Sequence, residues 1–207
     1  MGKFMRSIIL VLAVAFIFSG CAKPPTQEIN DSKALIEAVT NIDTNTYASE
    51  ELAKLNGNLT AALDEVKIQD EKWFSKYDKA KEMLAALNAE AENVKTVAAQ
   101  RKEEAKNNAI AAQTEARTAI DTAKALLEKA PTGKGTKADI EMFKADLLGL
   151  EESLTALQQT IDEEKYSDAL NSANIINERA GVISNDITLA LEKVGVKIVP
   201  AVPQVIQ

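Results

Sequence analysis

The chain has 207 residues, with 31 acidic and 24 basic side chains, a formal net charge of −7, one cysteine and no histidine. Without histidine, a Ser-His-Asp triad, a Cys-His pair and zinc sites of the usual His/Cys kind are excluded. The acidic balance argues against nucleic acid as a partner, because such a surface repels phosphate backbones.

The N-terminal segment, residues 1–20, has the layout of a secretory signal peptide. A basic start precedes eleven apolar residues, 8–18, and Ser19, Gly20 and Cys21 follow at once. As a helix the apolar run would measure about 17 Å, too short for a hydrocarbon core of about 30 Å. It is therefore predicted to be a signal segment and not a membrane span.

A cysteine directly after two small residues resembles the lipobox of bacterial lipoproteins, although Phe18 stands where that motif usually has leucine. The resemblance implies cleavage between Gly20 and Cys21, and acylation of Cys21 with fatty acids such as palmitate. The alternative is an ordinary signal peptide with a chance cysteine. In either case the mature chain keeps 22 of the 24 basic residues against 31 acidic ones.

Residues 21–25 are expected to form a tether, since Pro24 and Pro25 cannot lie inside a helix. A first helix should follow, with Thr26 as its N-cap and apolar positions that extend to Ile42. After a polar, turn-like stretch, Ser49 is expected to cap a second helix whose leucines repeat at three-four spacing.

Whether the chain breaks near Asp70 is left open, because no glycine or proline occurs between Gly57 and Pro131. The apolar stripe predicts a helix over 73–129, about 85 Å long. Its regular positions are Trp73, Tyr77, Ala80, Leu84, Leu87, Ala91, Val94 and Ala98, then Ala105, Ala109, Ala112, Ala116, Ala119, Ala123, Leu126 and Ala130. A charged segment, 99–109, contains no large apolar side chain, and we interpret it as a waist between two packing units.

Residues 131–135 should end this helix, and Thr136 with Asp139 has the spacing of a capping box. A fourth helix is expected to open at this capping box, with apolar positions from Ile140 to Ile161 and a turn near Asp162 where the apolar phase breaks. A fifth helix should cover 166–194, with buried positions that include Ile183, Ala190 and Val194, and Gly195 should end it. The apolar tail, 196–207, is expected either to fold back onto the helices or to add as a strand to another protein.

The predicted fold is all-α: an elongated antiparallel bundle of about five helices with coiled-coil-like packing, in which two hairpin units share one long central helix. The first unit covers 26–104 and the second 105–195. A repeat supports this division, since Tyr77 and Tyr166 open helices whose apolar positions match at an offset of 89 residues. We expect both tyrosines to plug a hairpin with the hydroxyl in water, and Trp73 with Phe74 to form an apolar knot at a bundle end.

The motif Tyr47-Ala48-Ser49-Glu50-Glu51-Leu52, a leucine stripe and then Tyr77-Asp78-Lys79-Ala80 resemble a bacterial lipoprotein domain, the TPR-like domain of unknown function, family 4398. The likeness covers roughly residues 24–110. The chain departs from the family pattern at 69–71, where the turn has no glycine. The resemblance implies a helical-hairpin envelope lipoprotein with no assigned activity and no catalytic residues.

These features predict a non-enzymatic, lipid-anchored structural or adaptor protein of the bacterial envelope, with no cofactor, metal or catalytic residue. In the enteric sorting rule, an aspartate after the acylated cysteine retains a lipoprotein in the inner membrane. This chain has Ala22 there, so by resemblance to that rule the protein should be anchored through Cys21 in the outer membrane, facing the periplasm. Its expected partner is another envelope protein or a peptidoglycan-associated component. The alternative is a helical module that carries a lipid or other apolar ligand; a paired-carboxylate enzyme acting on glycans is the third hypothesis.

Overall fold

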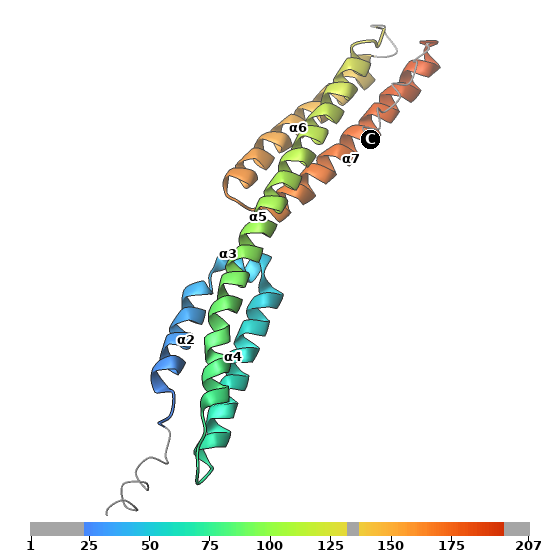
Figure 1. Cartoon of the computed structure of the whole chain (residues 1–207). Helices are drawn as coiled ribbons and strands as arrows, with labels where there is room; N and C mark the ends of the chain where they lie inside the picture. The colour runs from blue at the N-terminus through green and yellow to red at the C-terminus, as the bar shows by residue number, and fades with distance from the viewer. Residues whose placement is uncertain (1–22, 132–136, 197–207) are drawn as a thin grey trace, which may run out of the picture. The chain divides into compact units, whose positions relative to one another are not determined.

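The computed structural model of the protein describes residues 23–131 and 137–196, which are almost entirely helical (Figure 1). These residues form the helices α2 (Thr26–Val39), α3 (Ile42–Tyr47), α4 (Ser49–Asp70), α5 (Asp78–Leu127), α6 (Lys137–Asp162) and α7 (Tyr166–Lys193). The all-α helical bundle expected from the sequence is confirmed, with the short α3 in addition to the five expected helices. Within the described ranges, none of the helices combines the length and apolarity that crossing a bilayer would require.

The chain divides into two compact units between Lys102 and Glu103. Unit 1 contains α2, α3, α4 and the first part of α5, and unit 2 contains the rest of α5 with α6 and α7. The sequence pattern predicts this division two residues later, after residue 104. Helix α5 is continuous through it, so one helix supplies a packing face to each unit.

The polar stretch after α2 is a short helix and not the open turn that the sequence predicts. Asn41 caps α3: its side chain accepts a hydrogen bond from the Thr44 N–H at 3.0 Å, and the Asn41 N–H donates to the Thr44 hydroxyl at 2.9 Å. This reciprocal pair satisfies backbone donors that a helix start leaves free. Because the chain restarts here, Ile42 leaves the apolar face of α2 and is exposed, contrary to the prediction.

Two expected N-caps are wrong by one residue. Pro25, and not Thr26, precedes α2, and its carbonyl accepts from the Ile29 N–H at 3.0 Å. Ala48, and not Ser49, precedes α4. Pro25 is also fully buried, so this residue belongs to the packed unit and not to the predicted tether.

Unit 1 packs α2, α4 and the first part of α5 around a shared apolar core. Its buried members are Ile36, Val39, Ala48, Leu52, Leu55, Ala62, Leu84, Leu87, Ala91, Val94 and Ala98. On α5 these positions alternate at steps of three and four, as the sequence pattern predicted. From Ala99 to Asn108 no residue of α5 is buried, and the boundary between the two units, after Lys102, falls within the charged segment 99–109.

In unit 2 the buried side chains of α6 are all large, whereas those of α5 and α7 mix alanines with larger residues. The buried residues of α6 are Phe143, Leu147, Leu150, Leu154, Leu157 and Ile161. Those of α5 in this unit are Ala109, Ala112, Ala116, Ile120, Ala123 and Leu127, and those of α7 are Tyr166, Ala169, Ala173, Ile176, Ala180, Ile187 and Leu191.

The predicted stripe is wrong by one residue toward the far ends of α5 and α7. Ile120 and Leu127 are buried where Ala119 and Leu126 were expected, and Leu191 is buried where Ala190 and Val194 were expected. A strict three-four alternation has a period of 3.5 residues, whereas a straight helix has about 3.6. The difference accumulates to about 20° per heptad, which turns the next residue into the core.

The last turns of α6 and α7 have the same backbone hydrogen bonds. After α6, the Lys165 N–H donates to the Thr160 carbonyl at 3.1 Å and the Glu164 N–H donates to Ile161 at 2.9 Å. After α7, the equivalent bonds run from Val196 to Leu191 and from Gly195 to Glu192, each 3.0 Å. Both are Schellman caps with a left-handed residue, Gly195 at φ 83° and Glu164 at φ 59°. The predicted turn near Asp162 and the predicted stop at Gly195 are confirmed.

Candidate functional site

The expected acylation site lies outside the described residues. Cys21 and Gly20, like the tail from Lys197 and the capping residue Thr136, fall in segments that the structure leaves undescribed. The described chain starts at Lys23, and the packed unit starts at Pro25. Because Pro25 is the fourth residue after Cys21, the two Cα atoms can be at most about 14 Å apart.

The start of α2 lies at the same end of unit 1 as the turn between α4 and α5 (Figure 1). Ile29 packs against a small apolar cluster made of Val66, Tyr77 and Ala80. The adjacent residues form an ion pair, in which the Lys81 ammonium lies 3.5 Å from the Glu28 carboxylate. These contacts fix the N-terminal end of α2 beside the α4–α5 turn.

Side-chain hydrogen bonds hold the α4–α5 turn in shape. The Gln69 side-chain carbonyl accepts from the Lys76 backbone N–H at 3.3 Å, and the Tyr77 hydroxyl donates to the Asp70 carboxylate. Tyr77 is buried, so the expectation that its hydroxyl reaches water is wrong; the hydroxyl is bound by the carboxylate that ends α4. The break left open near Asp70 is present, and the long helix starts at Asp78 and not at Trp73.

Trp73 and Phe74 lie in this turn with their side chains in solvent. Trp73 is 87% exposed and Phe74 is 68% exposed, so the predicted apolar knot at the end of the bundle is wrong. The physical reason is the break itself: once α4 ends at Asp70, the three-four spacing no longer places Trp73 on the buried stripe. The segment KWFSK, two aromatics between lysines at 72–76, is the sequence signal that could have marked this turn as a surface feature.

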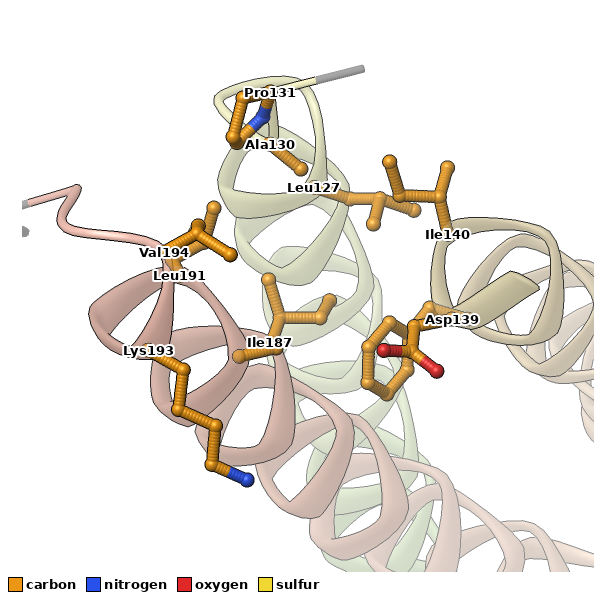
Figure 2. Close-up of a pocket in the computed structure, with 11 residues that line it drawn as sticks. Leu127, Ala130, Pro131, Asp139, Ile140, Ile187, Leu191, Lys193 and Val194 are labelled. Atoms are coloured by element: carbon orange, nitrogen blue, oxygen red, sulfur yellow. The ribbon is translucent and has the colours of Figure 1, made fainter. Parts of the chain in front are cut away.

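A pocket of about 240 Å³ opens at one end of unit 2 (Figure 2). Its lining comes from the end of α5, the start of α6 and the end of α7, and consists of Leu127, Ala130, Pro131, Asp139, Ile140, Phe143, Ile187, Ala190, Leu191, Lys193 and Val194. Ligand pockets usually measure about 300–1,000 Å³, so this one has room for a small apolar group. It lies past the stripe of alanines that runs from Ala105 to Ala123 on α5.

A second, more open hollow of about 380 Å³ lies between α5 and α6. Four of its seven lining residues are charged: Lys124, Glu128, Lys144 and Glu151. Lys124 and Glu151 form an ion pair there. A larger volume with charged walls is a solvated surface between helices, and the apolar pocket at the helix ends is the better candidate for a ligand.

Arg101, which interrupts the apolar stripe, has a structural partner in unit 1. Its guanidinium donates to both oxygens of the Glu51 carboxylate, at 2.8 Å and 3.0 Å, and to the Tyr47 carbonyl at 3.0 Å. Lys102 lies 3.0 Å from Asp43 in the same way. The first residues of the charged segment 99–109 therefore attach α5 to α3 and α4, an arrangement that the sequence pattern did not indicate.

The carboxylates with shifted pKa values are held in the ionised form. A hydrogen bond from the backbone lowers the pKa of Glu51, with Arg101 as the second cause. The Lys79 ammonium, 2.7 Å away, is the largest cause that lowers the pKa of Glu65, and Lys165 does the same for Glu163. A general acid needs a raised pKa, so these three groups are poor proton donors near neutral pH.

Among residues 23–131 and 137–196, no group of three or more Asp, Glu, His or Cys side chains is arranged to hold a metal ion. Comparison with known proteins found no matching family model, no matching characterised protein and no matching solved structure. The likeness to the TPR-like family 4398 therefore depends on the sequence motifs quoted above and stays a prediction.

Proposed function

We propose that the protein is a non-enzymatic structural or adaptor lipoprotein of the bacterial cell envelope, anchored at Cys21 and facing the periplasm, with the outer membrane as its location. The observation that carries the proposal is the lipobox-like pattern that ends at Cys21, close in sequence to the first packed residue, Pro25. With so short a connection, the acyl chains would hold unit 1 directly at the membrane surface.

An exposed apolar stripe on α7 supports a role in binding another protein. Ile175, Val182 and Leu189 are each about half exposed and recur every seven residues, so they share one face of the helix. This face points away from the buried seam at Ala173, Ala180 and Ile187. Large apolar side chains aligned on a surface are typical of protein contacts, and we place the partner-binding face of the adaptor here.

Site-specific crosslinking in intact cells tests this proposal. The full-length chain would carry a photoreactive amino acid at Val182, and a matched variant would carry it at Thr60, an exposed position on α4. We expect one defined envelope protein to crosslink through Val182 and not through Thr60. Equal labelling from both positions, or labelling from neither, would remove the support for an α7 adaptor surface.

A second candidate function is a carrier of a small apolar ligand, and the pocket at Leu127 and Leu191 is the observation that favours it. Native mass spectrometry of the mature protein distinguishes the two. A co-purifying apolar molecule that is lost in an Ile187→Trp variant would favour the carrier. If the unaltered protein and the Ile187→Trp variant both show the mass of the protein alone, and Val182 crosslinks to a partner, the adaptor is favoured.

A further inference from the structure

We infer that the Trp73–Phe74 turn is a second membrane contact, which enters the lipid interface beside the acyl anchor and fixes the orientation of unit 1 on the bilayer. The inference rests on the proposed anchoring at Cys21 and adds to it a specific lipid-binding surface. We define this surface, the aromatic tip, as residues 71–76.

The aromatic tip has the composition of an interfacial lipid contact. Its two aromatic side chains are 87% and 68% exposed, the most of any aromatic among the described residues of unit 1, and they are adjacent in sequence. Tryptophan and phenylalanine with nearby lysines are favoured at the boundary between headgroups and acyl chains. Lys72 and Lys76 flank the pair, and against them the tip has one carboxylate, Glu71.

The local charge differs from that of the whole chain. The protein as a whole is acidic and would be repelled by an anionic bilayer. Within the tip, however, Lys72 and Lys76 outnumber the one carboxylate, Glu71. Asp70, which accepts a hydrogen bond from the Tyr77 hydroxyl, and Asp78 lie just outside the tip and keep their charge. The tip therefore offers two lysines to anionic headgroups, in contrast to the acidic chain as a whole.

The geometry of unit 1 brings the tip to the membrane side. Pro25 is at most about 14 Å along the chain from Cys21. Ile29, one turn into α2, packs against Val66 and Tyr77 at the base of the tip. An anchor at Cys21 therefore places this end of unit 1, and not the end with α3, next to the bilayer (Figure 1).

The tip is also preformed, so inserting it requires little ordering of the backbone. The Lys72 N–H donates to the Gln69 backbone carbonyl at 3.1 Å, and the Gln69 side chain accepts from the Lys76 N–H at 3.3 Å. Gln69 itself is buried and bonded to Glu65 at 2.7 Å. Because these Gln69 hydrogen bonds fix the turn, its exposed aromatic side chains can enter the lipid without unfolding α4 or α5.

Trp73 is the only tryptophan of the chain, so its fluorescence reports on the tip alone. The test uses the full mature protein, extracted from envelopes and reconstituted in vesicles of phosphatidylcholine and phosphatidylglycerol with brominated acyl chains. We expect a blue-shifted emission that the brominated lipid quenches and that aqueous iodide does not reach.

A matched control moves the probe to the other end of unit 1. In the double variant Trp73→Phe, Ile42→Trp the fluorophore lies at the start of α3, about 30 Å away if measured along the 22 residues of α4. Both positions are exposed, so neither substitution disturbs the core. We expect the fluorophore at position 42 to be quenched by iodide and untouched by the brominated lipid.

The outcomes separate the inference from the proposed function. In one outcome the protein carries the acyl mass and floats with the vesicles, but iodide and not the brominated lipid quenches Trp73. This result would overturn the membrane contact of the aromatic tip and leave the anchor intact. A chain without acyl mass that does not float would overturn the anchoring and, with it, the inference.

Discussion

Unit 1 and unit 2 use the same helix, α5, in different ways. In unit 1, α5 contributes both large and small side chains, such as Leu84 and Ala91, and α4 does the same. In unit 2, the buried side chains of α6 are all large, and α5 meets them with alanines up to Ala116. Both units have polar links between helices, such as Arg101 to Glu51 in unit 1 and Lys124 to Glu151 in unit 2. One continuous helix can therefore serve two cores of different composition when a charged segment separates its two faces.

The largest expected effect is the loss of a buried leucine in either core. Leu87→Ala in unit 1 and Leu157→Ala in unit 2 should each lower the free energy of unfolding by about 2–5 kcal/mol, because each removes packing and leaves a cavity. Hydrogen exchange read by mass spectrometry should show lost protection in the substituted unit only. If either substitution removes protection from both units, the two cores are not independent and the comparison fails.

An oversized side chain in the alanine seam should have the next largest effect. Ala116 is fully buried in unit 2, and Ala116→Leu should destabilise by about 1–3 kcal/mol through overpacking against α6. Ala111 lies on the exposed side of the same helix, and Ala111→Leu should change stability by at most about 0.5 kcal/mol. Urea unfolding of both variants measures this contrast, and equal midpoints would mean that α5 does not approach its neighbours closely there.

A smaller change is expected at the turn between α6 and α7. Glu164 has a left-handed backbone that glycine adopts without strain, so Glu164→Gly should stabilise unit 2 by roughly 0.5–1 kcal/mol. Gly195→Ala is the matched reverse change in the second Schellman cap and should destabilise by about 1 kcal/mol. Thermal unfolding should therefore move in opposite directions for the two variants, and a shift in the same direction would contradict the assignment of both caps.

The smallest effect is the response of unit 1 to acid. Because Lys79 and Gln69 lower the pKa of Glu65 below its ordinary value of 4.5, the folded state holds this carboxylate ionised more firmly than the unfolded state does. The stabilisation is complete above pH 4.5 and is lost as the pH falls through the folded-state pKa. Glu65→Gln should flatten this part of the pH profile in chemical unfolding, and an unchanged slope would show that Glu65 does not carry the effect.

The helices and their buried faces could largely be predicted from the sequence, because three-four spacing is a local property. The break after Asp70 could not be settled, since it depends on hydrogen bonds from Gln69 and Tyr77 that the periodicity does not reveal. The drift to Ile120 and Leu127 escapes a strict heptad pattern because the helix keeps its own, slightly longer period.

The candidate sites were less predictable than the fold. The prediction of acylation at Cys21 uses local sequence alone, since a signal segment is recognised by the order of its residues along the chain. The aromatic tip and the pocket beside Leu191 depend on which helix ends meet, and this is decided by packing between segments far apart in the sequence. The role of Arg101 could not be predicted for the same reason. In the sequence it only interrupts the apolar stripe, because its carboxylate partner, Glu51, lies 50 residues earlier.

The intact mass of the mature protein purified from bacterial envelopes tests the central claim most directly. The account predicts a chain that begins at Cys21 and carries the mass of its acyl groups, together with a Cys21→Ser variant that keeps residues 1–20 and carries none. An unacylated chain that begins elsewhere, or a Cys21→Ser variant that is cleaved and membrane-bound like the unaltered protein, would contradict it.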